Sequence, residues 1–188
     1  MAFDLTGRLL IATPAMGDPR FARSVILLCA HGDDGAFGLV INRPMPDLTF
    51  AEVLEQLAIG AGDPPAHQTV LAGGPVEPVR GFVLYRDDDA AGTPEDAALP
   101  GGLALSASPE ILEAIARGTG PADWVLALGY AGWGPGQLEE EIAQNGWLTA
   151  DCDPALVFSP TRGDALWQRA LQSMGVDPLT LSAVAGHA

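Results

Sequence analysis

The residues that could carry acid-base or metal chemistry are few in this sequence. His31, His67 and His187 are the only histidines, and Cys29 and Cys152 are the only cysteines. Cys29 and His31 would share one face of a strand, but two ligands are too few for a metal site and nothing in the sequence fixes the others. A buried thiol and a strand-end histidine bonded to the backbone are the simpler interpretation. We therefore expect no metal, and we assign no catalytic residue.

A second kind of chemistry is anion binding. Arg43 follows Asn42 at the end of an expected strand, where its guanidinium could meet a phosphate or carboxylate in bidentate geometry. Two glycine-rich stretches, residues 73–75 and residues 129–136, could bring backbone N–H groups close to an anion. The competing interpretations are a structural salt bridge for Arg43, a plain turn at residues 73–75 and close backbone packing at residues 129–136. The residues that we predict to form a ligand site are His31, Asn42, Arg43, Gly73, Gly74, Gly132 and Trp133.

Residue types and motifs that are absent from the sequence exclude several reaction classes. The chain has no lysine, which removes Schiff-base chemistry, a pyridoxal phosphate linkage and a Walker lysine. It also has no HExxH or GxSxG motif, and its glycine spacing is not the dinucleotide fingerprint, so we expect no cofactor. Two hypotheses stay open. One is a non-catalytic regulatory protein that acts through a protein partner, and the other is a small-molecule hydrolase or transferase with a site near His31, Asn42 and Arg43.

The net charge of the protein further restricts the classes of partner that it can bind. The formal net charge is -15, from 24 acidic residues against nine arginines. Such a surface repels phosphodiester backbones and anionic lipids, so we expect no direct contact with nucleic acid and none with a membrane. No apolar run approaches the roughly 20 residues that span a bilayer, and the N-terminal residues lack the pattern of a secretory signal. We therefore expect a cytoplasmic protein with reduced cysteines.

The first half of the chain is dominated by apolar segments typical of strands. These are residues 9–12, 24–31 and 36–42, and Gly32-Asp33-Asp34-Gly35 is typical of a hairpin turn between the last two. A helix should follow, with Thr49 as its N-cap and Glu52 as the partner in a capping box.

The second half alternates short strands with helices. We predict strands at residues 69–71, 81–85, 103–105, 124–128 and 156–158, and helices from Ser108 to Arg117, around residues 137–142, and from Asp164 to Met174. The polar residues 86–96 should form an exposed loop whose aspartates are solvated rather than metal-bound. Together the segments predict one α+β domain over residues 1–188, with a mainly antiparallel sheet and about four peripheral helices.

The same segments carry a resemblance to a known family that runs almost end to end. The stretches concerned are residues 10–14 (LIATP), 18–19 (DP), 23–25 (RSV), His31, 35–36 (GA), Gly38, 42–44 (NRP), 73–76 (GGPV), 80–84 (RGFVL), 129–133 (GYAGW), 136–139 (GQLE), Glu141, Asn145, 147–148 (WL) and 186–188 (GHA). In these stretches the sequence resembles the AlgH/YqgE family of bacterial proteins.

The resemblance implies a bifurcated sheet curled into a pseudo-barrel, a cytosolic setting and a role in transcriptional regulation without an agreed biochemical activity. It names no catalytic residue. Two positions depart from the family pattern, because Ala30 stands where members commonly carry Glu, and Tyr85 where they carry His. An acid-base role at these two positions is therefore not expected.

Overall fold

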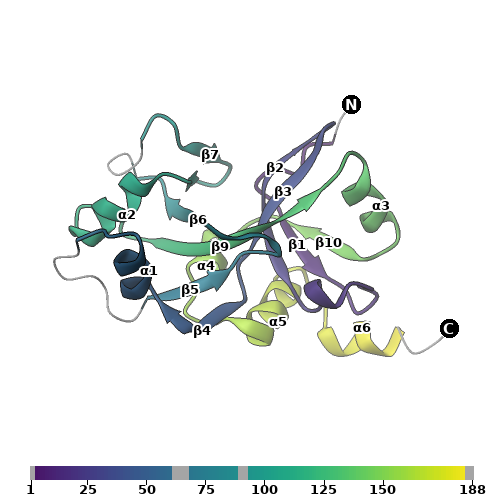
Figure 1. The fold of residues 1–188 in the computed structure, drawn as a ribbon. Helices are drawn as coiled ribbons and strands as arrows, with labels where there is room; N and C mark the ends of the chain where they lie inside the picture. Colours follow the sequence, from purple (N-terminus) through teal and green to yellow (C-terminus); the bar gives the residue numbers. More distant parts are fainter. Residues whose placement is uncertain (1–2, 61–67, 89–92, 185–188) are drawn as a thin grey trace.

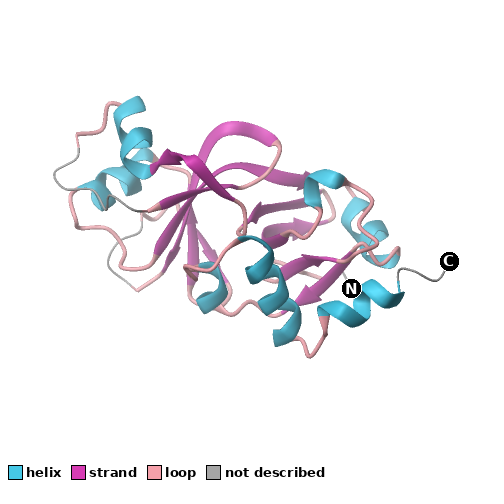
Figure 2. Ribbon diagram, turned by 90° about the horizontal axis from the view of Figure 1, so that it is seen from below, coloured by secondary structure: helices cyan, strands magenta, loops and turns pink. Residues whose placement is uncertain are grey.

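The computed structural model describes residues 3–60, 68–88 and 93–184, with side chains placed through residue 181. In these ranges ten strands form one sheet. Figure 1 shows the sheet curling along the molecule, and Figure 2 shows the helices on its outside. The strands are β1 (Leu9–Ala12), β2 (Val25–Gly32), β3 (Gly35–Val40), β4 (Pro44–Thr49), β5 (Thr69–Ala72), β6 (Val76–Arg86), β7 (Ala97–Leu99), β8 (Leu103–Ser106), β9 (Trp124–Trp133) and β10 (Trp147–Ala150).

The helices lie in the connections between strands. They are the 3-10 turn η1 (Pro19–Phe21), α1 (Phe50–Gln56), α2 (Pro109–Ala116), α3 (Gln137–Ala143), α4 (Pro154–Val157), α5 (Gly163–Ser173) and α6 (Pro178–Val184). The α+β class and the curled antiparallel sheet are therefore confirmed. The described residues hold six α-helices where the sequence predicted about four, because α4 and α6 were not foreseen.

Strand β9 is where the sheet divides. One of its edges pairs with β6 along residues 124–130. The other edge is shared, because residues 126–128 pair in parallel with β5 and residues 131–133 pair antiparallel with β3. The main path is β10-β1-β2-β3-β9-β6-β8-β7, with β5 and β4 leaving it at this branch. In Figure 1 β9 accordingly runs through the middle of the molecule, from the α2 side to the α3 side.

Strand β2 is apolar on both faces because it is covered on both. Leu27 packs in the cluster that contains Leu9 and residues of α5, whereas Ile26 and Leu28 pack in a second cluster with Trp133 and Trp147. The turn at Asp33 and Asp34 joins β2 to an antiparallel β3. The expected hairpin is confirmed.

Helix α1 begins with the predicted capping box. The Thr49 side chain accepts a hydrogen bond from the Glu52 amide, and the Glu52 carboxylate accepts one from the Thr49 amide. Helix α2 begins at Pro109 as expected, but the Ser108 side chain makes no capping bond, and its amide instead donates to Ser106 Oγ. Both helices pack on a third apolar cluster around Phe50 and Trp124.

Two predicted segments were wrong. Residues 156–158 do not form a strand, because Asp153 caps the amide of Ala155 and Pro154 occupies the first turn of α4. The strand predicted at residues 124–128 was too short, because residues 129–133 continue β9 and residues 131–133 pair with β3. A short apolar run is compatible with the periodicity of a helix or of a strand. At residues 156–158 the N-cap selects a helix, and at residues 129–133 pairing with a neighbouring strand extends β9.

Candidate anion-binding cleft

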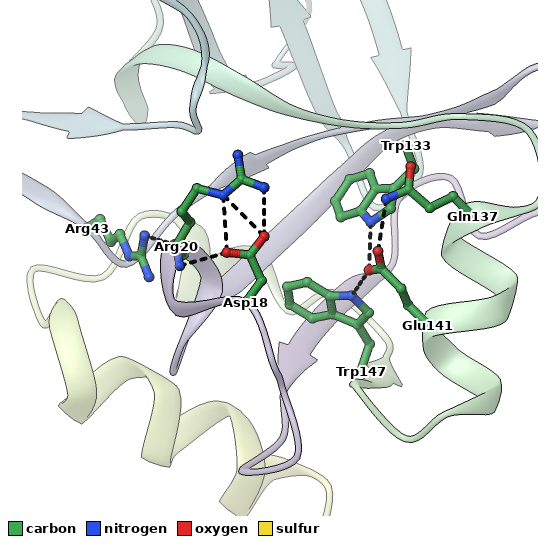
Figure 3. Close-up of polar contacts among 7 residues, drawn as sticks. All are labelled: Asp18, Arg20, Arg43, Trp133, Gln137, Glu141 and Trp147. Carbon is green, nitrogen blue, oxygen red and sulfur yellow. Dashed lines mark hydrogen bonds and ion pairs between the residues drawn. The ribbon is translucent and has the colours of Figure 1, made fainter.

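The cleft is built around η1, the short turn after β1. The Asp18 carboxylate accepts a hydrogen bond from the Arg20 amide at 2.9 Å. It also forms an ion pair with the Arg20 guanidinium at 2.7 Å. Arg43, which directly precedes β4, reaches the same turn and donates to the carbonyl oxygens of Arg20 and Ala22. Figure 3 shows the Arg20 backbone between the Asp18 carboxylate and the Arg43 guanidinium. Two guanidinium groups are thus held at one turn.

The electrostatics of the two arginines differ. Hydrogen bonds from Arg20 lower the pKa of the Asp18 carboxyl, so this pair is neutralised internally. Burial lowers the pKa of the Arg43 guanidinium, and the nearby Asp18 charge opposes that shift. Among the described residues Arg43 forms no ion pair, since its partners at η1 are carbonyl oxygens. A half-buried cation with no paired carboxylate favours an external anion.

Two cavities meet at the turn. The first has a volume of about 260 Å³ and is lined by Arg20, Phe21, Val40, Arg43, Ala72, Gly74 and Pro75. The second has a volume of about 120 Å³ and includes Asp18, Gly132, Trp133, Gln137 and Glu141 in its wall. Arg20, Phe21 and Pro75 belong to both walls, so the cavities are neighbours. In Figure 3 Asp18, Arg20 and Arg43 lie on one side of the cleft, and Trp133, Gln137 and Glu141 lie on the other.

Glu141 organises the aromatic side. Its Oε2 accepts hydrogen bonds from the indole nitrogens of Trp133 at 3.1 Å and Trp147 at 2.8 Å, and its Oε1 accepts one from Gln137 at 3.0 Å. Figure 3 shows the two indoles converging on this carboxylate. The Phe21 ring stacks on Trp133 and meets the edge of Trp147. Helix α3 and strands β9 and β10 are therefore tied to η1 by one carboxylate and three rings.

Three of the predicted site residues, His31, Asn42 and Gly73, do not line the two cavities. His31 Nδ1 accepts a hydrogen bond from the Leu5 amide and its Nε2 contacts Glu139 at 2.8 Å, so it joins the N-terminal segment to α3. The Asn42 side chain is buried and fully bonded, since it accepts from the Val25 amide and donates to the carbonyls of Arg23 and Gly163. Neither residue lines the two cavities.

The predicted glycines Gly73 and Gly74 directly follow β5, at the point where the sheet branches from β9. A Cβ on Gly73 would lie 2.3 Å from the Gly129 carbonyl oxygen, and one on Gly74 would lie 2.1 Å from the Tyr130 carbonyl carbon. The Gly73 amide donates to the Leu128 carbonyl oxygen. Close backbone approach therefore explains residues 73 and 74, while a Cβ on Gly132 would make only an ordinary contact with the Tyr130 ring at 3.6 Å. Gly74, Gly132 and Trp133 still line the cavities, so the anion site at these residues stays a prediction.

The remaining reactive groups are protected. Burial raises the pKa of the Cys29 thiol to about 12, and the neighbouring Cys152 adds to the shift. Burial also raises the pKa of the Cys152 thiol to about 12, and both cysteines are free. No group of three or more His, Cys, Asp or Glu that could hold a metal occurs among the described residues. His67 and His187, and part of the expected loop at residues 86–96, lie outside these residues.

Sequence reasoning found Arg43 but missed the residues around it. Asp18 and Glu141 were named only among the residues that carry the resemblance, and Arg20 and Phe21 were not considered. A local signal existed at η1, because an Asp-Pro pair is typical of a capped first turn. No local signal connects Glu141 to Trp147, since their contact depends on how α3 returns to β10.

Comparison with known proteins places this architecture among bacterial proteins. A model of a family described as AlgH-like matches residues 9–179. A UPF0301 protein of Ruegeria pomeroyi is 55% identical over 186 residues, covering 98% of this chain and 100% of the relative. A UPF0301 protein of Paracoccus denitrificans is 52% identical over 192 residues, covering 98% and 97%.

The fold is also found in solved structures. The solution structure of AlgH from Pseudomonas aeruginosa is 45% identical with a TM-score of 0.79, covering 100% of this chain and 98% of that one. A crystal structure of a protein from Corynebacterium diphtheriae is 26% identical with a TM-score of 0.70, covering 90% and 86%. Within the described part of the chain, the helices are too short or too polar for a membrane span.

Proposed function

This chain belongs to the AlgH-like family, and on that premise we propose that it is a non-catalytic regulatory protein that binds a small anionic ligand and acts through a protein partner. The ligand would bind in the cleft at η1, between Arg20 and Arg43. The protein would work in the cytoplasm. Any effect on transcription would be indirect, because a net charge of -15 opposes binding to DNA.

One observation carries the ligand half of the proposal. Arg43 is a half-buried guanidinium that lines a cavity of about 260 Å³ and has no carboxylate partner among the described residues. Arg20 lines the same cavity, and its side chain is 64% exposed, so it can turn from Asp18 toward an incoming anion. A phosphate or carboxylate that contacts both groups would form charge-assisted hydrogen bonds.

The alternative function, a hydrolase or transferase near His31, Asn42 and Arg43, gains no support from this geometry. His31 bonds to Leu5 and Glu139, and the Asn42 side chain is used by three backbone groups. Neither lies in the wall of the cavity that contains Arg43. A nucleophile and a base must lie within hydrogen-bond reach of each other and of a substrate site, and these residues do not offer that arrangement.

The test is a thermal-shift titration of the full chain with inorganic phosphate, inorganic pyrophosphate and succinate. At about 100 times Kd a ligand adds about 2.7 kcal/mol to the free energy of unfolding. For a chain of this size that gain should raise Tm by roughly 5–10 °C. Arg20→Ala should abolish the shift, because Arg20 contributes one of the two guanidinium groups. Arg43→Lys should weaken it, because lysine keeps the charge but loses the fork geometry.

The matched control is Arg117→Ala, which removes one exposed arginine from the end of α2 and changes the net charge equally. Its Tm shift with each anion should equal that of the wild type. Asp18→Asn should bind the anions more tightly, because asparagine can still cap η1 but no longer neutralises Arg20. The ligand half of the proposal fails if none of the three anions raises Tm, or if Arg20→Ala and Arg117→Ala behave alike.

A further inference from the structure

The cleft at η1 holds a second unpaired charge besides Arg43. Glu141, on α3, is half-buried and lines the smaller cavity of about 120 Å³. Its carboxylate accepts hydrogen bonds from the indole nitrogens of Trp133 and Trp147 and from the Gln137 amide, which are neutral donors. Among the residues that the structure describes, no cationic side chain forms an ion pair with it. Glu141 is therefore an anion without a cation, just as Arg43 is a cation without an anion.

The Glu141 carboxylate can still accept a hydrogen bond. An ionised carboxylate offers about four lone-pair sites on its two oxygens. Oε2 uses its sites for the two indole N–H groups, and Oε1 accepts one bond, from Gln137. A further donor can therefore bind to Oε1. An ammonium group would supply this donor together with the missing positive charge.

The charges of the cleft follow one another in a definite order. In Figure 3 Arg43 lies at one end, the Arg20–Asp18 ion pair lies in the middle and Glu141 lies at the other end. Arg43 belongs to the wall of the larger cavity and Glu141 to that of the smaller, and both walls include Arg20. The two unpaired charges thus face neighbouring cavities, on opposite sides of a pair that is neutralised internally.

A simple anion would satisfy only one of these unpaired charges. A phosphate or carboxylate at Arg20 and Arg43 leaves Glu141 without a cation, and a second anionic group in the smaller cavity would be repelled by that carboxylate. A ligand with an anionic group and an ammonium group would pair with both. Phe21 and Trp133 lie in the wall of the smaller cavity, and the water that their rings displace strengthens the attraction between the charges.

The hydrogen bonds favour an organic cation over a metal ion. Both oxygens of Asp18 already accept bonds from the Arg20 side chain. Oε2 of Glu141 accepts from two indoles, so Oε1 is left as a single ligand atom. Metal ions of the kind that carboxylates bind take several oxygen ligands, whereas an ammonium group is well bound by one carboxylate.

We propose that the ligand of this cleft is a zwitterionic small molecule, with a carboxylate or phosphate at Arg20 and Arg43 and an ammonium group at Glu141. The inference rests on the proposed function, since it names the class of the anionic ligand that was proposed for the same cleft. Amino acids with separated charges and aminoalkyl phosphates belong to this class. A monoanion lacks one of the two contacts and a dianion is repelled at Glu141, so the cleft selects against both.

The test is isothermal titration calorimetry of the full chain with butyrate, 4-aminobutyrate and succinate. These probes have carbon chains of the same length and differ in the group at one end. An ionic strength of about 0.15 M limits the influence of distant charges. 4-Aminobutyrate should bind at least about tenfold more tightly than either of the others, because it adds an ion pair with Glu141. The same comparison with hexanoate, 6-aminohexanoate and adipate covers a longer separation of the two charges.

A lysine in the wall tests which group holds the amine. In Gln137→Lys the new ammonium would lie one helical turn before Glu141 and pair with it, so it would take the place of the ligand's amine. The amino acids should lose their advantage over the monoacids in this variant. Gln144→Lys is the matched control, because it makes the same change at an exposed residue next to α3 and outside both walls. It should keep the preference of the wild type.

Glu141→Gln removes the charge directly and should also abolish the advantage. Because this change alters the hydrogen bonds to the indoles, a urea denaturation curve must first show that the variant is folded. Gln137→Lys leaves those two bonds in place, so it tests the proposal even if Glu141→Gln does not fold. Arg20→Ala should weaken butyrate and 4-aminobutyrate alike, since both carry the anionic group.

The possible failures can be told apart. Equal affinity of each amino acid and its monoacid for the wild type would overturn the proposal. So would an advantage of 4-aminobutyrate that persists in Gln137→Lys as it does in Gln144→Lys. If phosphate raises Tm through Arg20 but no amine improves affinity, this inference falls and the anion site of the proposed function stands. If neither phosphate nor any of these probes binds, both fall.

Discussion

Glu141 is the residue that connects the polar and aromatic sides of the cleft. Replacement by glutamine would turn one of its two oxygens into a donor, which then faces an indole N–H or the Gln137 amide instead of accepting from it. A buried donor left unpaired costs about 1–3 kcal/mol. We expect Glu141→Gln to lower the free energy of unfolding by that amount in urea denaturation. The emission of the two tryptophans should also change in the folded state.

The control for this prediction is Glu140→Gln, one position earlier on α3. Glu140 is exposed, so the same loss of charge should change stability by less than about 0.5 kcal/mol. Equal effects of the two substitutions would mean that the hydrogen bonds to the indoles contribute nothing measurable.

At the residue scale, the sequence predicted only some of the residues that line the cleft. Arg43, Gly74, Gly132 and Trp133 do line the two cavities, because each directly adjoins a strand end or a crossing of strands. Asn42 has the same sequence context as Arg43, but its side chain points the other way into the protein. Which of two neighbouring polar side chains faces a cavity depends on tertiary packing, and periodicity does not supply it.

At the scale of elements, the branch of the sheet explains the glycines. Three backbone segments meet where β5, β3 and β6 all contact β9, and the distances at residues 73, 74 and 129 leave no room for a Cβ. Gly129 also takes a positive φ of 75°, which suits the bend between the two pairings. Close backbone packing was one interpretation of residues 129–136, and a plain turn was one interpretation of residues 73–75. Neither interpretation could show that the two stretches meet where parts of one sheet join.

The branch gives a prediction for Gly74→Ala. The new methyl group would lie 2.1–2.4 Å from backbone atoms of Tyr130 and Ala131, so the strands would have to separate. We expect a loss of at least about 2 kcal/mol in the free energy of unfolding. Urea denaturation measures it. Gly132→Ala is the control on the same branch, since its nearest atom is the flexible Tyr130 ring at 3.6 Å, and it should change stability by less than about 0.5 kcal/mol. A Gly74→Ala protein as stable as Gly132→Ala would contradict this account of the branch.

The elements that sequence reasoning predicted are those with a strong local cause. The β2–β3 hairpin has its aspartate turn, and α1 has its capping box. Strand β10 was missed because it has only four residues and pairs only with β1, at the edge of the sheet. Long-range pairing, rather than local preference, forms such a strand.

For the whole molecule, fold and charge were predictable because each follows from the complete sequence. Alternating apolar segments and the family resemblance predicted the curled α+β sheet, and the composition gives the net charge directly. The position of the cavity of about 430 Å³ beside α1 and α2 was not predictable. Its wall combines β4, α1, β6, residues 106–108, α2 and β9, which are separated by up to about half of the chain and meet through the branched sheet.

The whole molecule should also lose stability in acid. Asp4, Asp18, Glu52 and Glu139 accept hydrogen bonds that lower their pKa values in the folded state. A lowered folded pKa stabilises the protein above the unfolded pKa, and that contribution is lost as the pH falls through the folded value. Few carboxyls titrate between about pH 7 and pH 5, so the free energy of unfolding should change little there. Below about pH 4 it should fall steadily.

Urea denaturation followed by tryptophan fluorescence and circular dichroism from pH 7 to pH 3 measures this dependence. The two signals should give one common transition if residues 1–188 form a single domain. Glu52→Gln should flatten the acid slope, because glutamine keeps the capping bond to Thr49 without a titrating proton. Glu55→Gln, outside the capping box of the same helix, should leave the slope unchanged. Rising stability from pH 5 to pH 3 would show instead that relief of repulsion among the 24 acidic residues outweighs the lost hydrogen bonds.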